Sequence, residues 1–141
     1  MPIKNYTTKV PANKSIQEIQ DSLVKHGAAG FLLEYQQGTG RIKALKFILE
    51  MEGRKIPFEL PVEWQLFQAV LKQQRVGKWN DEDYCYRVAW RVLRDWVMAQ
   101  MALYETKMVT IPQIFLPYAV SSNGKTIYEN VATQPEMFLL Q

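Results

Sequence analysis

Three arginines at regular spacing are the side chains in this 141-residue sequence best suited to binding chemistry. Arg87, Arg91 and Arg94 follow the spacing i, i+4, i+7, which aligns them along one ridge of a helix. Guanidinium groups beside aromatic rings can contact phosphates and stack on bases. The competing interpretation is local pairing, because Asp83 lies four residues before Arg87 and Asp95 four residues after Arg91. We favour the paired ridge, with Arg94 as the arginine left for an external contact.

A second set of basic residues lies in the first half of the chain. Residues 1–78 hold 12 Lys or Arg against 7 Asp or Glu, whereas residues 79–141 hold 5 against 7. The candidates in the first half for contact with a nucleic-acid backbone are Arg41, Lys43, Arg54, Lys55, Arg75 and Lys78. The aromatic candidates for partner contacts are Trp79, Tyr84 and Trp90. Arginine, tyrosine and tryptophan also dominate protein interfaces, so these residues leave nucleic acid and protein open as partners.

Catalytic and metal chemistry have few candidates in this sequence. Cys85 falls at the centre of the apolar face of a predicted helix, which favours a buried and inert thiol. His26 precedes Gly27 at a predicted helix end, where an imidazolium complements the helix dipole. One histidine and one cysteine are too few for a closed zinc site. We therefore predict no catalytic residue, no metal ligand and no cofactor, and a protein that is not an enzyme.

The stretch from Ala119 to Thr126 fits a loosened phosphate-loop pattern, with alanine in place of the first glycine. A nucleotide-binding domain needs a helix after this loop and then a strand that carries an aspartate for magnesium. Only fifteen residues follow Thr126, and none is an aspartate. We interpret Asn123-Gly124 instead as a turn, because this dipeptide is the strongest short signal for a hairpin.

The elements that must position these residues are arranged around a long helix expected at 80–107. Asn80 is its predicted N-cap, and the acidic residues 81–83 complement the positive end of the helix dipole. The apolar residues cover about half of the helix circumference, which is wider than the stripe of an ordinary surface helix. We expect neighbours to pack against this helix from two directions.

The preceding residues predict a helix, three strands and a second helix. Ser15 and Glu18 have capping-box spacing for the first helix, which ends at His26-Gly27. Strands are expected at 29–35, 41–51 and 54–60, and the alternation of apolar and polar residues is clearest in the third. Pro57 cannot donate to a ladder, so the third strand belongs at an edge. The second helix is expected at 62–74, after Pro61.

This order predicts one α+β domain over residues 1–141, a three-stranded antiparallel meander with helices packed on one face. After residue 107 the pattern weakens, and residues 126–131 are expected to form either the returning strand of a C-terminal hairpin or a short helical turn. The apolar segment Met137-Phe138-Leu139-Leu140 is expected to dock on the body of the protein, with partner contact as the alternative. Together with the broad apolar face, this segment also allows homo-oligomerisation.

The composition indicates the cellular compartment in which we expect the protein. No apolar run approaches the length that spans a bilayer, and residues 1–10 lack the apolar core of a secretory signal. The single cysteine excludes an intramolecular disulfide, which is usual for a reducing compartment. We therefore expect a cytoplasmic protein without a membrane partner.

The segments KNYTTKVPANKSIQEIQDSLVKHGA, RVAWRVLRDWVMAQMALYE and IFLPYAV resemble a group of uncharacterised small accessory proteins of bacteriophages and integrative mobile elements. The resemblance brings no catalytic residues, and it implies a context in which such proteins handle DNA or block host defences. The leading hypothesis is a non-enzymatic nucleic-acid-binding accessory protein, with DNA favoured. The alternative is a protein-binding inhibitor of a host defence system, comparable to an anti-CRISPR protein.

Overall fold

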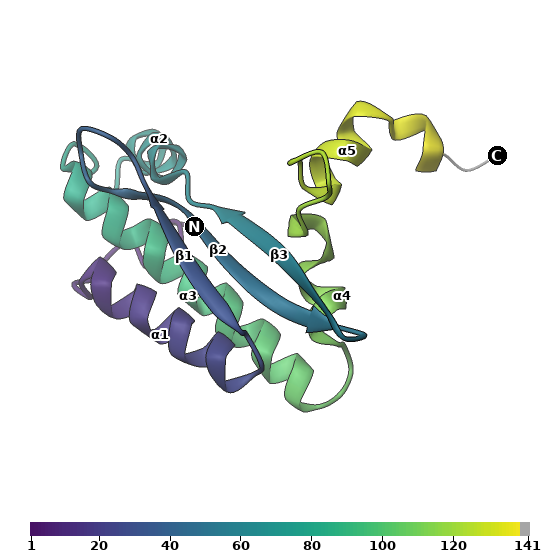
Figure 1. Ribbon diagram of the computed structural model, residues 1–141. Helices are drawn as coiled ribbons and strands as arrows, with labels where there is room; N and C mark the ends of the chain where they lie inside the picture. The colour runs from purple at the N-terminus through teal and green to yellow at the C-terminus, as the bar shows by residue number, and fades with distance from the viewer. Residues whose placement is uncertain (139–141) are drawn as a thin grey trace.

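The computed structural model describes the backbone of residues 1–138 and the side chains of residues 1–136. Its elements follow the order of the chain (Figure 1): α1 (Ala12–Lys25), β1 (Gly30–Tyr35), β2 (Ile42–Met51), β3 (Arg54–Pro61), α2 (Trp64–Gln74), α3 (Glu82–Glu105), α4 (Ile111–Phe115), the 3₁₀ turn η1 (Leu116–Tyr118), α5 (Ile127–Thr133) and the 3₁₀ turn η2 (Pro135–Phe138). The α+β class is confirmed.

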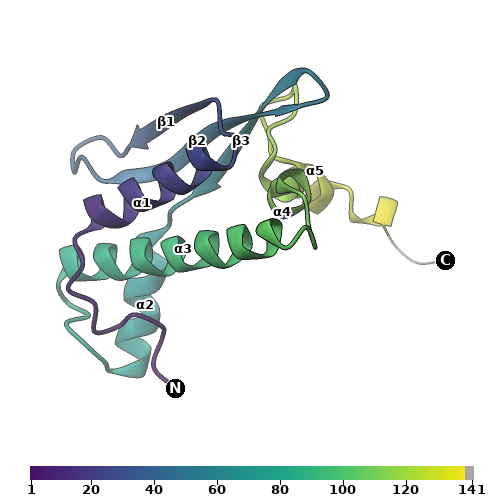
Figure 2. The same cartoon turned by 90° about the horizontal axis from the view of Figure 1, so that it is seen from below.

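The three strands form an antiparallel meander in the order β1-β2-β3. Figure 2 shows α1 and α3 on the same side of this sheet, whereas no described helix covers its other face, which we call the uncovered face. Phe47 pairs with Phe31 on β1 and with Phe58 on β3, so one row of rings crosses the inner face. The alternation predicted for β2 and β3 therefore points the expected side chains at the helices.

Helix α3 separates two apolar clusters. On one side, Trp90, Val97 and Met101 pack with α1 and the inner face of the sheet. On the other side, Cys85 and Val88 pack with α2 and with residues of the N-terminal segment. The prediction of a helix packed from two directions is confirmed, because α1 and the sheet pack on one side of α3 and α2 packs on the other.

Two helix starts differ from the sequence expectation. Helix α3 begins at Glu82, and the carboxylate of Asp81 rather than the side chain of Asn80 accepts the capping hydrogen bond, from the N–H of Tyr84 at 3.3 Å. Helix α1 begins at Ala12 with Pro11 in the N-cap position, so the predicted Ser15 cap is wrong. Ser15 lies inside the helix and is fully buried, and no group in the described part of the chain forms a hydrogen bond with its hydroxyl.

Beyond α3, the chain turns back along the free edge of β3. The N–H of Val120 donates to the carbonyl of Pro57 at 2.9 Å, and Ala119 forms an isolated bridge with Phe58. The position of β3 at an edge is thus confirmed, and Pro57 contributes its carbonyl where it has no N–H to offer.

The predicted C-terminal hairpin is reduced to one bridge between Val120 and Thr126. Thr126 and Glu129 form a capping box that starts α5 immediately after the turn at Gly124, so the helical alternative for residues 126–131 is the one observed. Within residues 1–138, no helix is both long enough and apolar enough to cross a membrane.

Candidate functional site

The structure removes Arg41 from the set of free binding residues. Its guanidinium lies 3.1 Å from a carboxylate oxygen of Glu82 and 2.7 Å from one of Asp83. It also lies over the ring of Trp64, with 4.9 Å from Cζ to the ring centroid. The hydrogen bond to Asp83 is the main cause of a pKa raised above the ordinary value for arginine. Arg41 therefore ties the start of β2 to the start of α3.

The uncovered face of the sheet is balanced in charge and is not a basic surface. Lys43 and Lys46 both pair with Glu34, at 3.0 and 2.8 Å. Lys46 also stands opposite Glu59 in the ladder, and the hydrogen bond with Glu34 raises the pKa of Lys46. Lys55 stands opposite Glu50. The expected phosphate-binding role of the sheet has no continuous basic surface to support it.

Two of the three arginines of the α3 ridge, Arg91 and Arg94, are paired, but not with the predicted acids. One carboxylate oxygen of Glu18 on α1 lies 2.9 Å from Arg91 and 2.7 Å from Arg94, and Arg94 also reaches Asp95 at 3.1 Å. The expectation that Arg94 is free is wrong, and so are the expected pairs Asp83–Arg87 and Asp95–Arg91. The partner of the ridge comes from α1, because that helix packs along α3.

Glu18 makes this contact sensitive to pH. Burial acts to raise the pKa of its carboxyl, but hydrogen bonds and charge from Arg94 and Arg91 outweigh burial and hold it below the ordinary value of 4.5. Since the folded pKa is lowered, the carboxylate stabilises the fold above pH 4.5, and this contribution is lost as pH falls through the folded pKa.

We expect Glu18→Gln to reduce the free energy of unfolding by about 1–2 kcal/mol at pH 7, because both arginines lose a charged acceptor. At pH 3 the difference from the unsubstituted chain should be smaller, since the wild-type carboxyl then approaches protonation as well. Urea unfolding at the two pH values measures the effect. Asp21→Asn, on an exposed position of the same helix, is the control. An equal difference at both pH values would contradict this account.

Two of the three aromatic partner candidates are buried. Trp90 has 0% exposure, and among the described residues its indole Nε1 has no hydrogen-bond partner, so this ring is not accessible for the predicted partner contact. Tyr84 is 6% exposed, and burial raises the pKa of its hydroxyl. Helical spacing placed Trp90 at the edge of the apolar arc, but α1 and the sheet extend the core over it. Only Trp79 remains partly exposed.

A group of basic side chains gathers where α2 turns into α3, and we call it the basic corner. It consists of Lys72, Arg75, Lys78 and Arg87, together with Trp79. Lys72, Arg75 and Lys78 are exposed and Arg87 is half-buried. None of the four forms a salt bridge with a carboxylate among the described side chains. Arg54 and Lys55 lie apart from them, at the β2–β3 turn (Figure 1).

The backbone of the α2–α3 loop fixes this corner. Arg75 caps α2 in the left-handed conformation at φ 56°, and Gly77 follows at φ 65°. Gly77 lies against the ring of Tyr84, and the guanidinium carbon of Arg87 lies 5.7 Å from the centroid of the same ring. Tyr84 thus joins the loop to the first turns of α3, as a buried support rather than as a contact residue.

Lys72 is the member of the corner that sequence reasoning missed. Its ammonium lies 5.5 Å from the centroid of the Trp79 ring. The carbonyl of Trp79 accepts hydrogen bonds from the side-chain amide of Gln68 and from the thiol of Cys85. Lys72 lies one helical turn before Arg75, near the end of α2. This spacing is the feature of the sequence that could have identified Lys72 as a member of the corner.

The catalytic candidates occupy structural positions. Cys85 is fully buried, and burial raises the pKa of its thiol, which disfavours the reactive thiolate. His26 ends α1 as predicted, with Nδ1 2.6 Å from the carbonyl of Ser22 and Nε2 3.1 Å from Glu105. These contacts tie the end of α1 to the end of α3. Over the described residues, no group of three or more His, Cys, Asp or Glu side chains could hold a metal ion.

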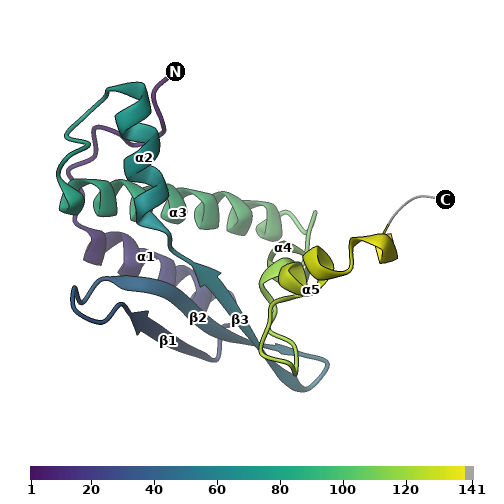
Figure 3. The ribbon, with the colours of Figure 1, turned by 90° about the horizontal axis from the view of Figure 1, so that it is seen from above.

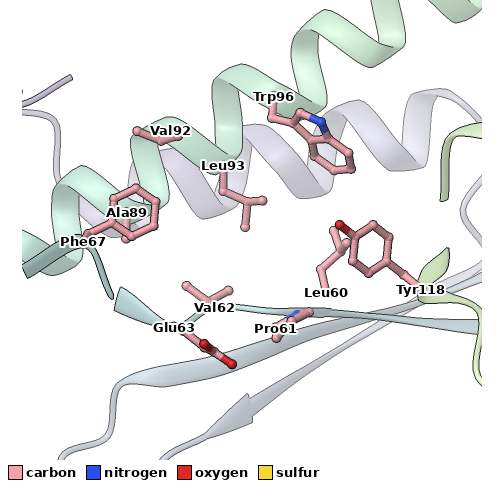
Figure 4. A pocket seen from close by; sticks show the side chains of 10 residues that line it. All are labelled: Leu60, Pro61, Val62, Glu63, Phe67, Ala89, Val92, Leu93, Trp96 and Tyr118. Carbon is pink, nitrogen blue, oxygen red and sulfur yellow. The ribbon is translucent and has the colours of Figure 1, made fainter. Parts of the chain in front are cut away.

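An apolar groove of about 340 Å³ lies on the other side of α2 (Figure 4). It runs between the face of α3 and the end of β3, with Phe67 at one end and Tyr118 at the other. Its lining residues are Leu60, Pro61, Val62, Glu63, Phe67, Ala89, Val92, Leu93, Trp96 and Tyr118.

The chain matches no protein-family model, and no curated protein or solved structure shows significant similarity to it.

Proposed function

We propose that the protein is a non-enzymatic accessory protein that binds the phosphate backbone of nucleic acid, with DNA favoured, through the basic corner. The observation that carries this proposal is the difference in pairing between two sets of basic residues. Arg41, Arg91 and Arg94 are held by carboxylates, whereas the four basic residues of the corner have no such partner among the side chains of residues 1–136. Unpaired basic side chains on one surface supply the electrostatic attraction of a phosphate-binding site.

The chemistry of the corner suits single-stranded nucleic acid in particular. Lysine ammonium groups contact phosphates as point charges, and an adjacent partly exposed indole offers a surface on which an unpaired base can stack. The left-handed backbone at Arg75 and Gly77 turns the loop sharply. The ammonium of Lys72 lies against the ring of Trp79, and Lys78 precedes Trp79 in the sequence. A few contacts of this kind give binding that depends on salt and tolerates sequence variation.

The test is a fluorescence-anisotropy titration with single-stranded and double-stranded DNA at two salt concentrations. We expect binding that weakens with salt, and a preference for the single strand. The variant K72Q/R75N/K78Q should bind at least about tenfold more weakly at low salt. Its salt slope should be smaller by about three, since each removed charge leaves one phosphate without its neutralising partner. Asparagine is chosen at position 75 because it tolerates the left-handed conformation.

The matched control is K14Q/K25Q/K125Q, which removes the same charge from exposed positions outside the corner. It should keep most of the affinity if the corner is the site. Equal weakening by the two triple variants would show that net charge alone drives binding. Absence of binding by the wild-type chain at low salt would overturn the proposal, and a nuclease-treated pull-down would then test a protein partner.

A further inference from the structure

The apolar groove has a form that fits an extended apolar peptide. Val92, Leu93 and Trp96 project into it from α3, and Val62 faces them from the end of β3 (Figure 4). Trp96 and Tyr118 meet edge to face at 6.1 Å and close one end. The groove therefore offers apolar side-chain contacts along its length.

The edge of β3 beside this groove is already paired. The N–H of Val62 donates to the carbonyl of Lys43 on β2. Along an antiparallel strand, the N–H and carbonyl groups of successive residues point alternately toward and away from the neighbouring strand. The N–H and carbonyl of Glu59 therefore point away from β2. The carbonyl of Pro57, which has the same direction, is already bonded to Val120. The antiparallel bridge between Phe58 and Ala119 places Tyr118 opposite Glu59, so this part of the β3 edge already pairs with the chain itself. The groove is therefore left to bind an occupant through apolar side-chain contacts.

The C-terminal arm of this chain, residues 126–140, carries apolar residues of the kind that the groove would bind. Helix α5 and η2 run away from the sheet and α3 in Figures 1 and 3, and no residue of α5 is buried. Tyr128 on α5 is 65% exposed and Leu116 at the base of the arm is 47% exposed. The sequence Met137-Phe138-Leu139-Leu140 follows, and its side chains lie outside the described residues.

We propose that the groove receives the segment Met137–Leu140 from a second copy of this chain, in a reciprocal exchange that forms a two-fold dimer. The occupant is uncharged and apolar, which suits the mostly apolar lining, and its side chains can enter the groove. The direction of α5 and η2 favours a second copy over the chain's own groove, because these two elements extend away from the sheet and α3 (Figures 1 and 3). A closed exchange covers both arms and leaves no apolar end free to propagate.

The first test is light scattering on the full chain over a wide range of concentration. The expected particle has twice the mass of the 16.4 kDa chain. The variant F138D/L139D should be a monomer with unchanged thermal stability at low concentration, because it alters only the arm. Val24→Glu, which changes an exposed apolar residue of α1, should remain a dimer.

The second test places the arm in the groove. Glu63→Cys adds a thiol at the exposed rim, where the side chain makes no capping bond, and Gln141→Cys adds one after the apolar segment. When the two single variants are mixed and oxidised, a disulfide should join one chain of each kind. The native Cys85 is fully buried and should not react.

A monomer at every concentration would overturn the proposal. So would an intramolecular disulfide in the variant that carries both cysteines, since the arm would then occupy the groove of its own chain. A dimer that persists in F138D/L139D would place the interface elsewhere and would also overturn it. None of these outcomes depends on nucleic-acid binding.

Discussion

Replacement of Phe47 by alanine is expected to reduce the free energy of unfolding by about 3–5 kcal/mol, the usual cost of removing a buried aromatic ring. Phe47 is 1% exposed and stands in the middle of β2. Its ring stacks on Phe58 at 5.4 Å, meets Phe115 edge to face at 5.1 Å, and lies 6.3 Å from Phe31. One substitution therefore removes the ring that joins all three strands to α4.

Urea unfolding measures this effect, and Leu32→Ala is the control. Leu32 lies on the neighbouring strand but points to the uncovered face and is 62% exposed, so its truncation should change stability by no more than about 0.5 kcal/mol. Comparable losses from the two variants would mean that the inner face is not the core of the sheet.

The contrast between Phe47 and Leu32 explains why the sheet could be predicted from sequence. In a strand the side chains alternate between faces, so the apolar positions of β2 and β3 identify the buried face locally. The same reasoning predicted the two-sided packing of α3 from its broad apolar arc. Both patterns are repeated several times within one element, and a repeated pattern does not depend on distant residues.

The charged contacts could not be predicted in this way. The partner of Arg91 and Arg94 is Glu18, which lies more than 70 residues away in the sequence. The sequence offered the acids four residues away as partners for these arginines. In the structure, however, Asp83 pairs with Arg41, and Asp95 pairs with Arg94 and Lys4. A long charged side chain can reach several partners, and the packing of the helices determines which partner lies close enough to form the ion pair.

The basic corner was partly visible in the sequence. The predicted residues included four of its members: Arg75, Lys78, Arg87 and Trp79. The same prediction also included basic residues that the structure places elsewhere or pairs with carboxylates. What the sequence lacked was the loop geometry, in which left-handed residues bring the end of α2 against the start of α3. The capping box of Thr126 and Glu129 was, by contrast, a local signal for α5 that the hairpin expectation overlooked.

The loop geometry of the corner is itself testable at Gly77. Alanine at this position is expected to reduce the free energy of unfolding by about 2–4 kcal/mol. This loss is the sum of two costs: a residue with a Cβ must adopt a left-handed backbone, and the added Cβ overpacks the site. An added Cβ would overlap the hydroxyl oxygen of Tyr84 and lie 2.7 Å from its Cζ. Tyr84 is buried against α2 and the N-terminal segment, so its ring has little room to move away.

Gly53→Ala separates the two causes. Gly53 has a similar φ of 78° in the β2–β3 turn, but a Cβ there would meet no atom within 4 Å. Its replacement should therefore show the backbone cost alone, about 1–2 kcal/mol. The excess loss in Gly77→Ala then measures the contact with Tyr84, and that excess should shrink when Tyr84→Ala is added, because the two residues are in contact. If the losses at positions 77 and 53 were equal, Tyr84 would not be the support that holds the basic corner against α3.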